Sequence, residues 1–226
     1  SCYMVFVLNF VCSFFFLMIR QPPRATQSRS SAAADVYKGQ YHTIDLKKRQ
    51  NSLSLKLHTM AKPVVALVNG HAVGGGCEIA ISTDFIIASE DAVFGQPEAM
   101  VGLSAGGGSP VFLPRLLPPG RAMQMLMTGE PITAQEAYRL GMVNEVHPHA
   151  ELMAAVLRIA EKIADNSPTA VQSVKRAVKM GQGETVEQAI EIMMDEHWRS
   201  VVHHDRVEGI LAFTEVRDPV FPDPDF

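Results

Sequence analysis

Two glutamates, Glu78 and Glu98, are the side chains of this sequence best placed to do chemistry. Glu78 stands just after three consecutive glycines, Gly74, Gly75 and Gly76, which follow an apolar run. Glycines at the start of a helix expose backbone N–H groups and allow a ligand to approach closely. Two carboxylates near such an opening can handle a water molecule and its protons. The pattern predicts acid–base chemistry on a ligand held by backbone N–H groups.

Each carboxylate also has a purely structural explanation when it is taken alone. A glutamate in the first turn of a helix, as Glu78 is expected to be, interacts favourably with the helix dipole. Glu98 follows a proline in the segment after a predicted strand, where a solvated turn or a helix N-terminus would equally suit it. Only the combination with the glycines favours a functional interpretation.

The elements that must position these residues can be predicted from residue 41 onward. Residues 63–68 form a short, β-branched apolar run bounded by proline and glycine, which is typical of a buried strand. The further elements expected in this part are a helix over 44–60, a helix over 76–82, and strands over 85–88 and 92–94. This alternation predicts an α/β core with a partly parallel sheet.

After residue 110 the sequence indicates an almost wholly helical region. Helices are expected over 121–127, 151–164, 168–180, 184–202 and 207–213, from apolar residues at i, i+3 and i+4. A capping box is predicted at Thr133 and Glu136, and Gly129 and Gly141 are expected to end helices. The predicted domains are a separate N-terminal segment over 1–40, an α/β core over 41–146 and a helical region over 147–226.

Composition excludes several classes of protein. The 226 residues carry a net charge of −4 and no long basic run, which excludes electrostatic binding of nucleic acid. Three cysteines give no disulfide framework. A reducing compartment fits, but so do many others; the compartment is left open, with a soluble protein of the cytoplasm or the mitochondrial matrix as the expectation and no membrane partner. No metal site is expected either, because the adjacent His203 and His204 would diverge on a helix.

The N-terminal segment needs a separate interpretation. Residues 2–19 form an apolar run just long enough for a signal anchor or a short membrane span. Nothing basic precedes the run, and no small-residue cleavage site follows it. Residues 14–38 are also similar to a translated sequencing adaptor, and we therefore leave residues 1–40 out of the fold prediction.

Two motifs of this sequence resemble those of the crotonase family, also called the enoyl-CoA hydratase/isomerase superfamily. They are Gly-Gly-Gly-Cys-Glu at 74–78 and Phe-Gly-Gln-Pro-Glu at 94–98. The resemblance extends from about Lys62 to the C-terminus and implies a ββα spiral core followed by helices. The site residues that it implies are Glu78 and Glu98 as catalytic groups, Gly75 in the oxyanion hole, and Gly74, Gly76 and Gly102 in substrate binding.

The resemblance further implies a lyase that adds water across the C2=C3 bond of a trans-2-enoyl-CoA, in fatty-acid or amino-acid breakdown. Coenzyme A would enter as part of the substrate, and no metal or redox cofactor would be needed. Two glutamates favour a hydratase, and an isomerase or another crotonase-type acyl-CoA enzyme is the alternative. A homotrimer or homohexamer is implied, with Trp198 near the subunit contact and the domain's own core as the competing explanation for the apolar residues around it.

The sequence departs from the family pattern in two places. Val216 stands where the resemblance would place a lysine near the coenzyme A phosphates. The upstream Gly-Ala-Asp-type loop, which would give the second oxyanion N–H, has one loose match at residues 32–35, with Ala34 as its candidate. The expectation is therefore a family member whose upstream part is missing or replaced, and an inactive truncated member stays an alternative.

Two patterns point to other classes of enzyme. Residues 102–106 fit the Gly-x-Ser-x-Gly elbow of serine hydrolases, with Ser104 as nucleophile, although no buried strand is predicted directly before them. Gly70, Gly74 and Gly76 fit a dehydrogenase glycine pattern. The short-chain dehydrogenases also need a Tyr-x-x-x-Lys pair, which this sequence lacks.

Overall fold

The computed structural model describes residues 53–222, and the expectations for residues 1–40 and Ala34 lie outside the described residues. Within this range the chain forms two compact units. Residues 53–58 and 65–153 make the first unit, and residues 59–64 and 154–222 make the second. No helix of residues 53–222 is long and apolar enough to cross a membrane.

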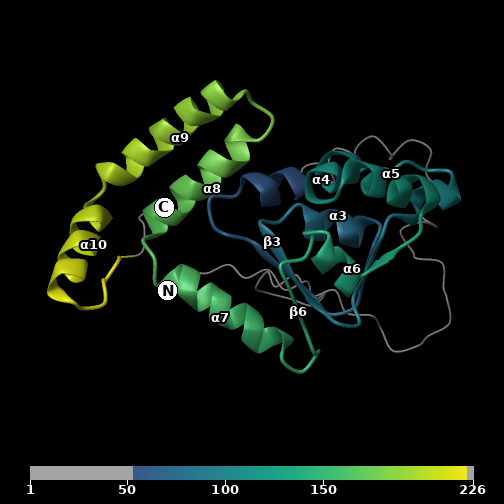
Figure 1. The fold of residues 1–226 in the computed structure, drawn as a ribbon, viewed down its shortest axis with the longest axis horizontal. Helices are drawn as coiled ribbons and strands as arrows, with labels where there is room; N and C mark the ends of the chain where they lie inside the picture. Colours follow the sequence, from purple (N-terminus) through teal and green to yellow (C-terminus); the bar gives the residue numbers. More distant parts are fainter. Residues whose placement is uncertain (1–52, 223–226) are drawn as a thin grey trace. The chain divides into compact units, whose positions relative to one another are not determined.

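Two three-stranded sheets organise the first unit (Figure 1). One has the order β1-β3-β6 with all strands parallel, and the other has the order β2-β4-β5, in which β2 and β4 are parallel and β4 and β5 antiparallel. The strands are β1 (Val65–Val68), β2 (His71–Val73), β3 (Phe85–Ser89), β4 (Val93–Gly95), β5 (Ile132–Thr133) and β6 (Glu145–His147). The predicted α/β core with a partly parallel sheet is confirmed.

The first unit is completed by short helices packed against these sheets. They are α3 (Gly75–Ile81), the 3₁₀ helix η1 (Pro97–Val101), α4 (Ser109–Leu116), α5 (Pro119–Thr128) and α6 (Ala134–Arg139), and a further helical segment covers residues 53–59. All four residues of β1 are buried, as expected for an inner parallel strand. The core gathers small and apolar side chains of α3, β3 and α5 around Phe94.

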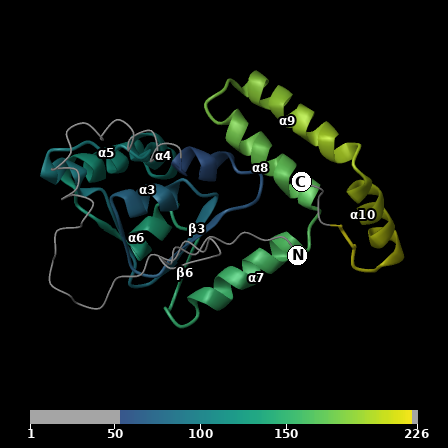
Figure 2. The same ribbon diagram turned by 180° about the vertical axis from the view of Figure 1, so that it is seen from behind.

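The second unit consists of long helices (Figures 1 and 2). They are α7 (Leu152–Ala164), which begins in the first unit, α8 (Pro168–Gly181), α9 (Val186–Val201) and α10 (His204–Glu215). Both views show α8 and α9 side by side as a hairpin. Ser167 caps α8 by accepting the Ala170 N–H at 3.1 Å, and Thr185 caps α9 in a reciprocal box with Gln188.

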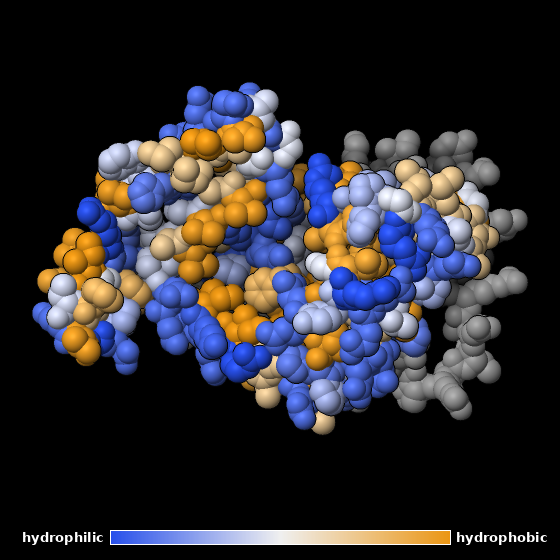
Figure 3. Space-filling view, viewed as in Figure 1, coloured by the Kyte–Doolittle hydropathy of each residue, from blue (hydrophilic) through white to orange (hydrophobic). Residues whose placement is uncertain are grey.

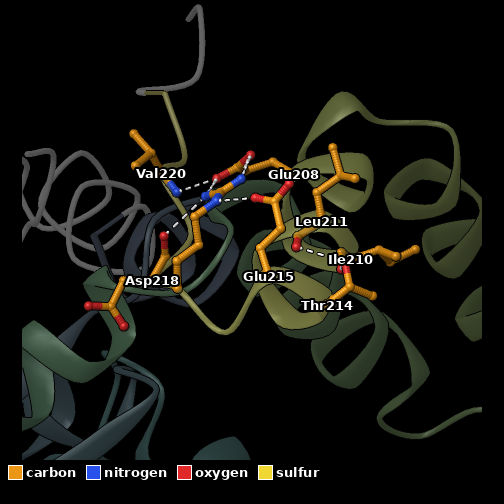
Figure 4. A network of polar contacts seen from close by, with 8 residues as sticks. Glu208, Ile210, Leu211, Thr214, Glu215, Asp218 and Val220 are labelled. Carbon is orange, nitrogen blue, oxygen red and sulfur yellow. Dashed lines mark hydrogen bonds and ion pairs between the residues drawn. The ribbon is translucent and has the colours of Figure 1, made fainter.

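The end of α10 is held by a network of ion pairs (Figure 4). Arg217 donates to both carboxylate oxygens of Glu208, at 2.6 and 3.0 Å, and to Glu215 at 2.6 Å. Glu208 also accepts the Val220 N–H at 2.8 Å. These bonds favour the charged carboxylate and lower the pKa of Glu208 to about 2. The network folds the chain after α10 back onto the helix, through Val216 in the left-handed conformation, at φ 53°.

Several sequence expectations need correction. The region after residue 110 is not almost wholly helical, because β5 and β6 lie within it. Strand β2 was also missed, since three residues are too few to show an alternating pattern. The capping box at Thr133 is half formed: its hydroxyl accepts the Glu136 N–H at 3.2 Å, but the Glu136 carboxylate accepts from Arg121 instead, at 2.9 Å. Gly129 does end α5, in the left-handed conformation.

Candidate active site

Glu78 lies in the first turn of α3 with only 6% of its surface exposed. Its Oε1 accepts the backbone N–H of Gly107 at 2.6 Å and that of Ser109 at 3.3 Å. Burial of a carboxylate is costly unless hydrogen bonds compensate for the lost water. The two backbone donors supply this compensation and fix the position of the carboxylate. A favourable interaction with the helix dipole therefore does not by itself explain why the Glu78 side chain is buried.

Gly107 allows this contact because it has no side chain. A Cβ built at Gly107 would stand 2.2 Å from Oε2 and 2.7 Å from Cδ of Glu78. Any other residue would therefore displace the carboxylate or the backbone. The segment of residues 103–106 has no regular structure, and Gly107 stands where it enters α4. The glycine-rich segment thus has a defined steric task beside Glu78.

Glu98 lies in the first turn of η1, directly after β4, and is partly buried. Burial raises the pKa of its carboxyl, and the negative charge of Glu78 raises it further. A Cβ built at Gly74 would stand 2.9 Å from Glu98 Oε1. The second carboxylate therefore lies against the glycine turn that begins α3, so the structure brings Glu78 and Glu98 to the same end of this helix.

The three glycines have different tasks in this turn. Gly74 adopts φ 57° and donates its N–H to the Gly95 oxygen at 2.9 Å, which ties the turn to β4. Gly75 and Gly76 begin α3, where N–H groups have no acceptor within the helix. A Cβ at Gly75 would meet no atom of the described residues within 4 Å. A ligand oxygen can therefore approach the start of α3 beside both carboxylates.

Gln96 and Cys77 belong to the same centre, although sequence reasoning gave neither a role. Gln96 is 1% exposed and its amide contacts the Cys77 thiol. Burial raises the pKa of Cys77 to about 12, so this thiol is a packing residue and not a nucleophile. The signal for Gln96 in the sequence is its place inside the Phe94–Glu98 motif, two residues before Glu98.

Gly102, Ser104 and the Gly70–Gly76 pattern do not form the active site of another class of enzyme. Gly102 ends η1 in the left-handed conformation, and a Cβ there would meet no described atom. Ser104 is exposed and follows η1, so the strand that a hydrolase elbow needs before its serine is absent from residues 97–103. In the dehydrogenase pattern a helix directly follows the glycine turn, but here β2 lies between Gly70 and α3.

The fold and the paired carboxylates define an α/β protein of the crotonase class. The sequence profile of the family described as enoyl-CoA hydratase/isomerase matches residues 32–224. This chain belongs to that family. The resemblance in the motifs begins at about Lys62, whereas the profile match begins earlier and includes residues 32–40.

Curated relatives and solved structures agree with this assignment. The chain is 39% identical over 170 residues to carnitinyl-CoA dehydratase of Escherichia coli K12, a match that covers 74% of this chain and 65% of that protein. It is 42% identical over 165 residues to crotonyl-CoA hydratase of Syntrophomonas wolfei, covering 73% and 64%. The crystal structure of an enoyl-CoA hydratase from Bacillus anthracis matches with a TM-score of 0.80 and 32% identity, covering 83% of this chain and 73% of that one. The chain therefore spans just under two thirds of the length of these curated relatives.

Proposed function

We propose that this protein adds water across the C2=C3 bond of a trans-2-enoyl-CoA, or removes it in the reverse direction. The observation that carries the proposal is the convergence of Glu78 and Glu98 at the start of α3, beside the open approach to Gly75. An N–H donor and a helix N-terminus suit the thioester oxygen, on which negative charge develops when a nucleophile adds at C3. Two carboxylates suit a water molecule that must lose one proton while the carbon gains another.

The environments of the two carboxylates support different roles. Glu78, held by two backbone donors, takes a proton from water as the oxygen adds to C3. Glu98, whose pKa is raised by burial and by the charge of Glu78, holds the proton that passes to C2. Transfer of a proton from Glu78 back to Glu98 then restores the starting state. Hydration changes no oxidation state, so the reaction calls for no redox cofactor, and coenzyme A takes part only as a portion of the substrate.

The surroundings of the site support an acyl thioester as substrate. Met100, Val101 and Leu103 follow Glu98 and expose apolar surface at the end of η1. Such surface suits the acyl chain of the substrate. The two relatives named as a crotonyl-CoA hydratase and a carnitinyl-CoA dehydratase also act, by their names, on acyl-CoA thioesters.

Hydration of crotonyl-CoA, followed by the loss of enoyl thioester absorbance, tests this proposal. Glu78→Gln and Glu98→Gln should each lower kcat by about 100-fold, since each removes one acid–base group. Glu90→Gln, at an exposed glutamate of the same unit, is the matched control and should leave kcat unchanged. If the enzyme were an isomerase, its isomerase activity would survive in one of the two Gln variants. Full activity in both, together with loss of activity in Ser104→Ala, would establish a hydrolase instead.

We also propose that the intact protein assembles as a homotrimer or homohexamer through its C-terminal helices. The expected contact residues are all at least partly exposed; they are Val186, Ala189, Ile190, Met193, Met194, Trp198, Val201, Val202, Ile210, Leu211 and Phe213. Figure 3 shows apolar side chains exposed over parts of these helices, among polar ones. Such patches mark interfaces more often than free surface. Sedimentation velocity tests the assembly: a stable monomer at micromolar concentration, unaltered by Trp198→Ala, would refute it.

A further inference from the structure

The junction of α9 and α10 brings together three side chains that can bind a metal ion. Adjacent histidines were expected to diverge on a helix, but His203 is the N-cap of α10 and has extended backbone angles, φ −79° and ψ 148°. Its ring therefore turns back over the helix start, and the ring centroids of His203 and His204 are 4.0 Å apart. Asp205, in the first turn of α10, points its carboxylate at both rings.

The atoms that meet at this junction are all electron-pair donors. Asp205 Oδ1 lies 3.2 Å from His203 Nδ1 and 3.3 Å from His204 Nε2. His203 Nδ1 already accepts the Asp205 N–H, at 3.3 Å, so it presents a lone pair and not a proton. Asp205 is 3% exposed, and its Oδ1 has no hydrogen-bond donor among residues 53–222. A buried carboxylate oxygen without a donor is unfavourable unless a positive charge lies beside it.

A metal ion bound to His203 Nδ1 would take the lone pair in place of the long bond from the Asp205 N–H. One cation bound to Asp205 Oδ1, His203 Nδ1 and His204 Nε2 would satisfy all three atoms together.

We propose that His203, His204 and Asp205 form a binding site for a divalent transition-metal ion such as zinc. Zinc binds imidazole nitrogen and carboxylate oxygen at about 2.0–2.2 Å, which sets the edges of its tetrahedron at about 3.3 Å. The two measured edges are 3.2 and 3.3 Å, and all three ligand atoms lie within 4.8 Å of one another. Imidazole ligands favour zinc over magnesium or calcium, which prefer oxygen.

The neighbouring helix start fixes the carboxylate for this purpose. Ser167, the N-cap of α8, donates its hydroxyl to Asp205 Oδ2 at 2.5 Å and so leaves Oδ1 directed at the histidines. Thr169 Oγ1 lies 3.3 Å from His203 Nε2, the ring nitrogen that is not a proposed ligand. Hydrogen bonds of this kind orient metal ligands in known sites. A bound ion would tie the start of α10 to the start of α8, with its remaining position open to water.

Zinc binding by the full chain, free of any histidine tag and treated with chelator, tests the proposal by calorimetry and by melting temperature. One zinc ion should bind per chain and raise the melting temperature, and magnesium should do neither. His204→Ala and Asp205→Asn should each weaken zinc binding at least tenfold, and Ser167→Ala about tenfold, as a positioning residue. His197→Ala, at an exposed histidine of α9, is the matched control and should bind zinc like the unaltered protein.

Cobalt gives a readout of geometry that does not depend on stability. Cobalt in the site should show the intense visible absorption of a tetrahedral ion, and His204→Ala should abolish it. His204 is largely exposed, so this variant keeps the fold, as an unchanged melting temperature without metal would show. The proposal is wrong if saturable zinc binding is absent below millimolar concentration, or if His204→Ala and the His197→Ala control bind zinc equally.

Discussion

Replacement of Gly107 by alanine is the sharpest test of how the proposed catalytic centre is built. The new Cβ would stand 2.2 Å from Glu78 Oε2, about 1.2 Å short of the 3.4 Å at which ordinary contact begins. The Glu78 carboxylate must therefore move by about 1 Å or lose its bond from the Gly107 N–H. That bond measures 2.6 Å, and a hydrogen bond to a charged group contributes about 1.5–3 kcal/mol.

The expected effect is on turnover more than on binding. A displacement of about 1 Å in a catalytic group can cost about 100-fold in rate, which corresponds to about 2.7 kcal/mol. Gly107→Ala should therefore lower kcat for crotonyl-CoA hydration about 100-fold with little change in KM. Gly106→Ala is the matched control, because its Cβ would meet only the Ser104 oxygen, at 3.9 Å.

A double-mutant cycle on stability gives a second, activity-independent measurement. Gly107→Ala should lower the free energy of unfolding in the unaltered chain by about 1–3 kcal/mol, and by much less in a Glu78→Ala background, where the clash is gone. Equal losses in both backgrounds would show that Gly107 serves the backbone alone. Full turnover in Gly107→Ala would refute the contact between Gly107 and Glu78 as the origin of the catalytic geometry.

Two further predictions concern stability. The pKa of Glu98 is raised in the folded state, so the folded chain binds more protons than the unfolded chain above pH 4.5, and stability is lost as the pH rises through the raised value. Glu98→Gln should remove this loss of stability, and so raise the melting temperature at pH 7 but not at pH 4. Equal shifts in melting temperature at pH 4 and pH 7 would contradict a raised pKa of Glu98. Val216 has a β-branched side chain at φ 53°, a conformation that costs about 1–2 kcal/mol, so Val216→Gly should raise the free energy of unfolding by up to about 1 kcal/mol in a urea titration. The same change at Val207, inside α10, should lower it, and a loss at both positions would show that Val216 is not strained.

Local sequence patterns predicted the elements that carry the site. The apolar run before Gly70 became β1, and α3 begins at Gly75, one residue before the expected start, because strand burial and the glycine turn are properties of contiguous residues. The glutamates of the same motifs lie in the first turns of α3 and η1, after the glycine turn and after β4 respectively. Patterns of this kind are visible without knowledge of the tertiary structure.

What the sequence did not reveal depends on contacts between distant residues. The shorter bond to Glu78 comes from Gly107, 29 residues later, and no local pattern distinguishes Gly107 from Gly106 or Gly108. Glu136 pairs with Arg121 in place of its own helix start for the same reason. The grouping of His203 with Asp205 was missed because the last helix was expected to begin at residue 207, whereas α10 begins at His204 and makes His203 its extended N-cap.

The segment between η1 and α4 also places a limit on how this chain can vary in length. Residues 103–106 are mostly exposed and irregular, which are the usual marks of a place where insertions are tolerated. Yet the N–H that holds Glu78 comes from the first residue after them. One residue added there would present a different backbone N–H, or a side chain, to the carboxylate. If the proposed function is correct, the number of residues in this loop sets the position of Glu78, and a deletion or insertion would act on the chemistry before it acted on the fold.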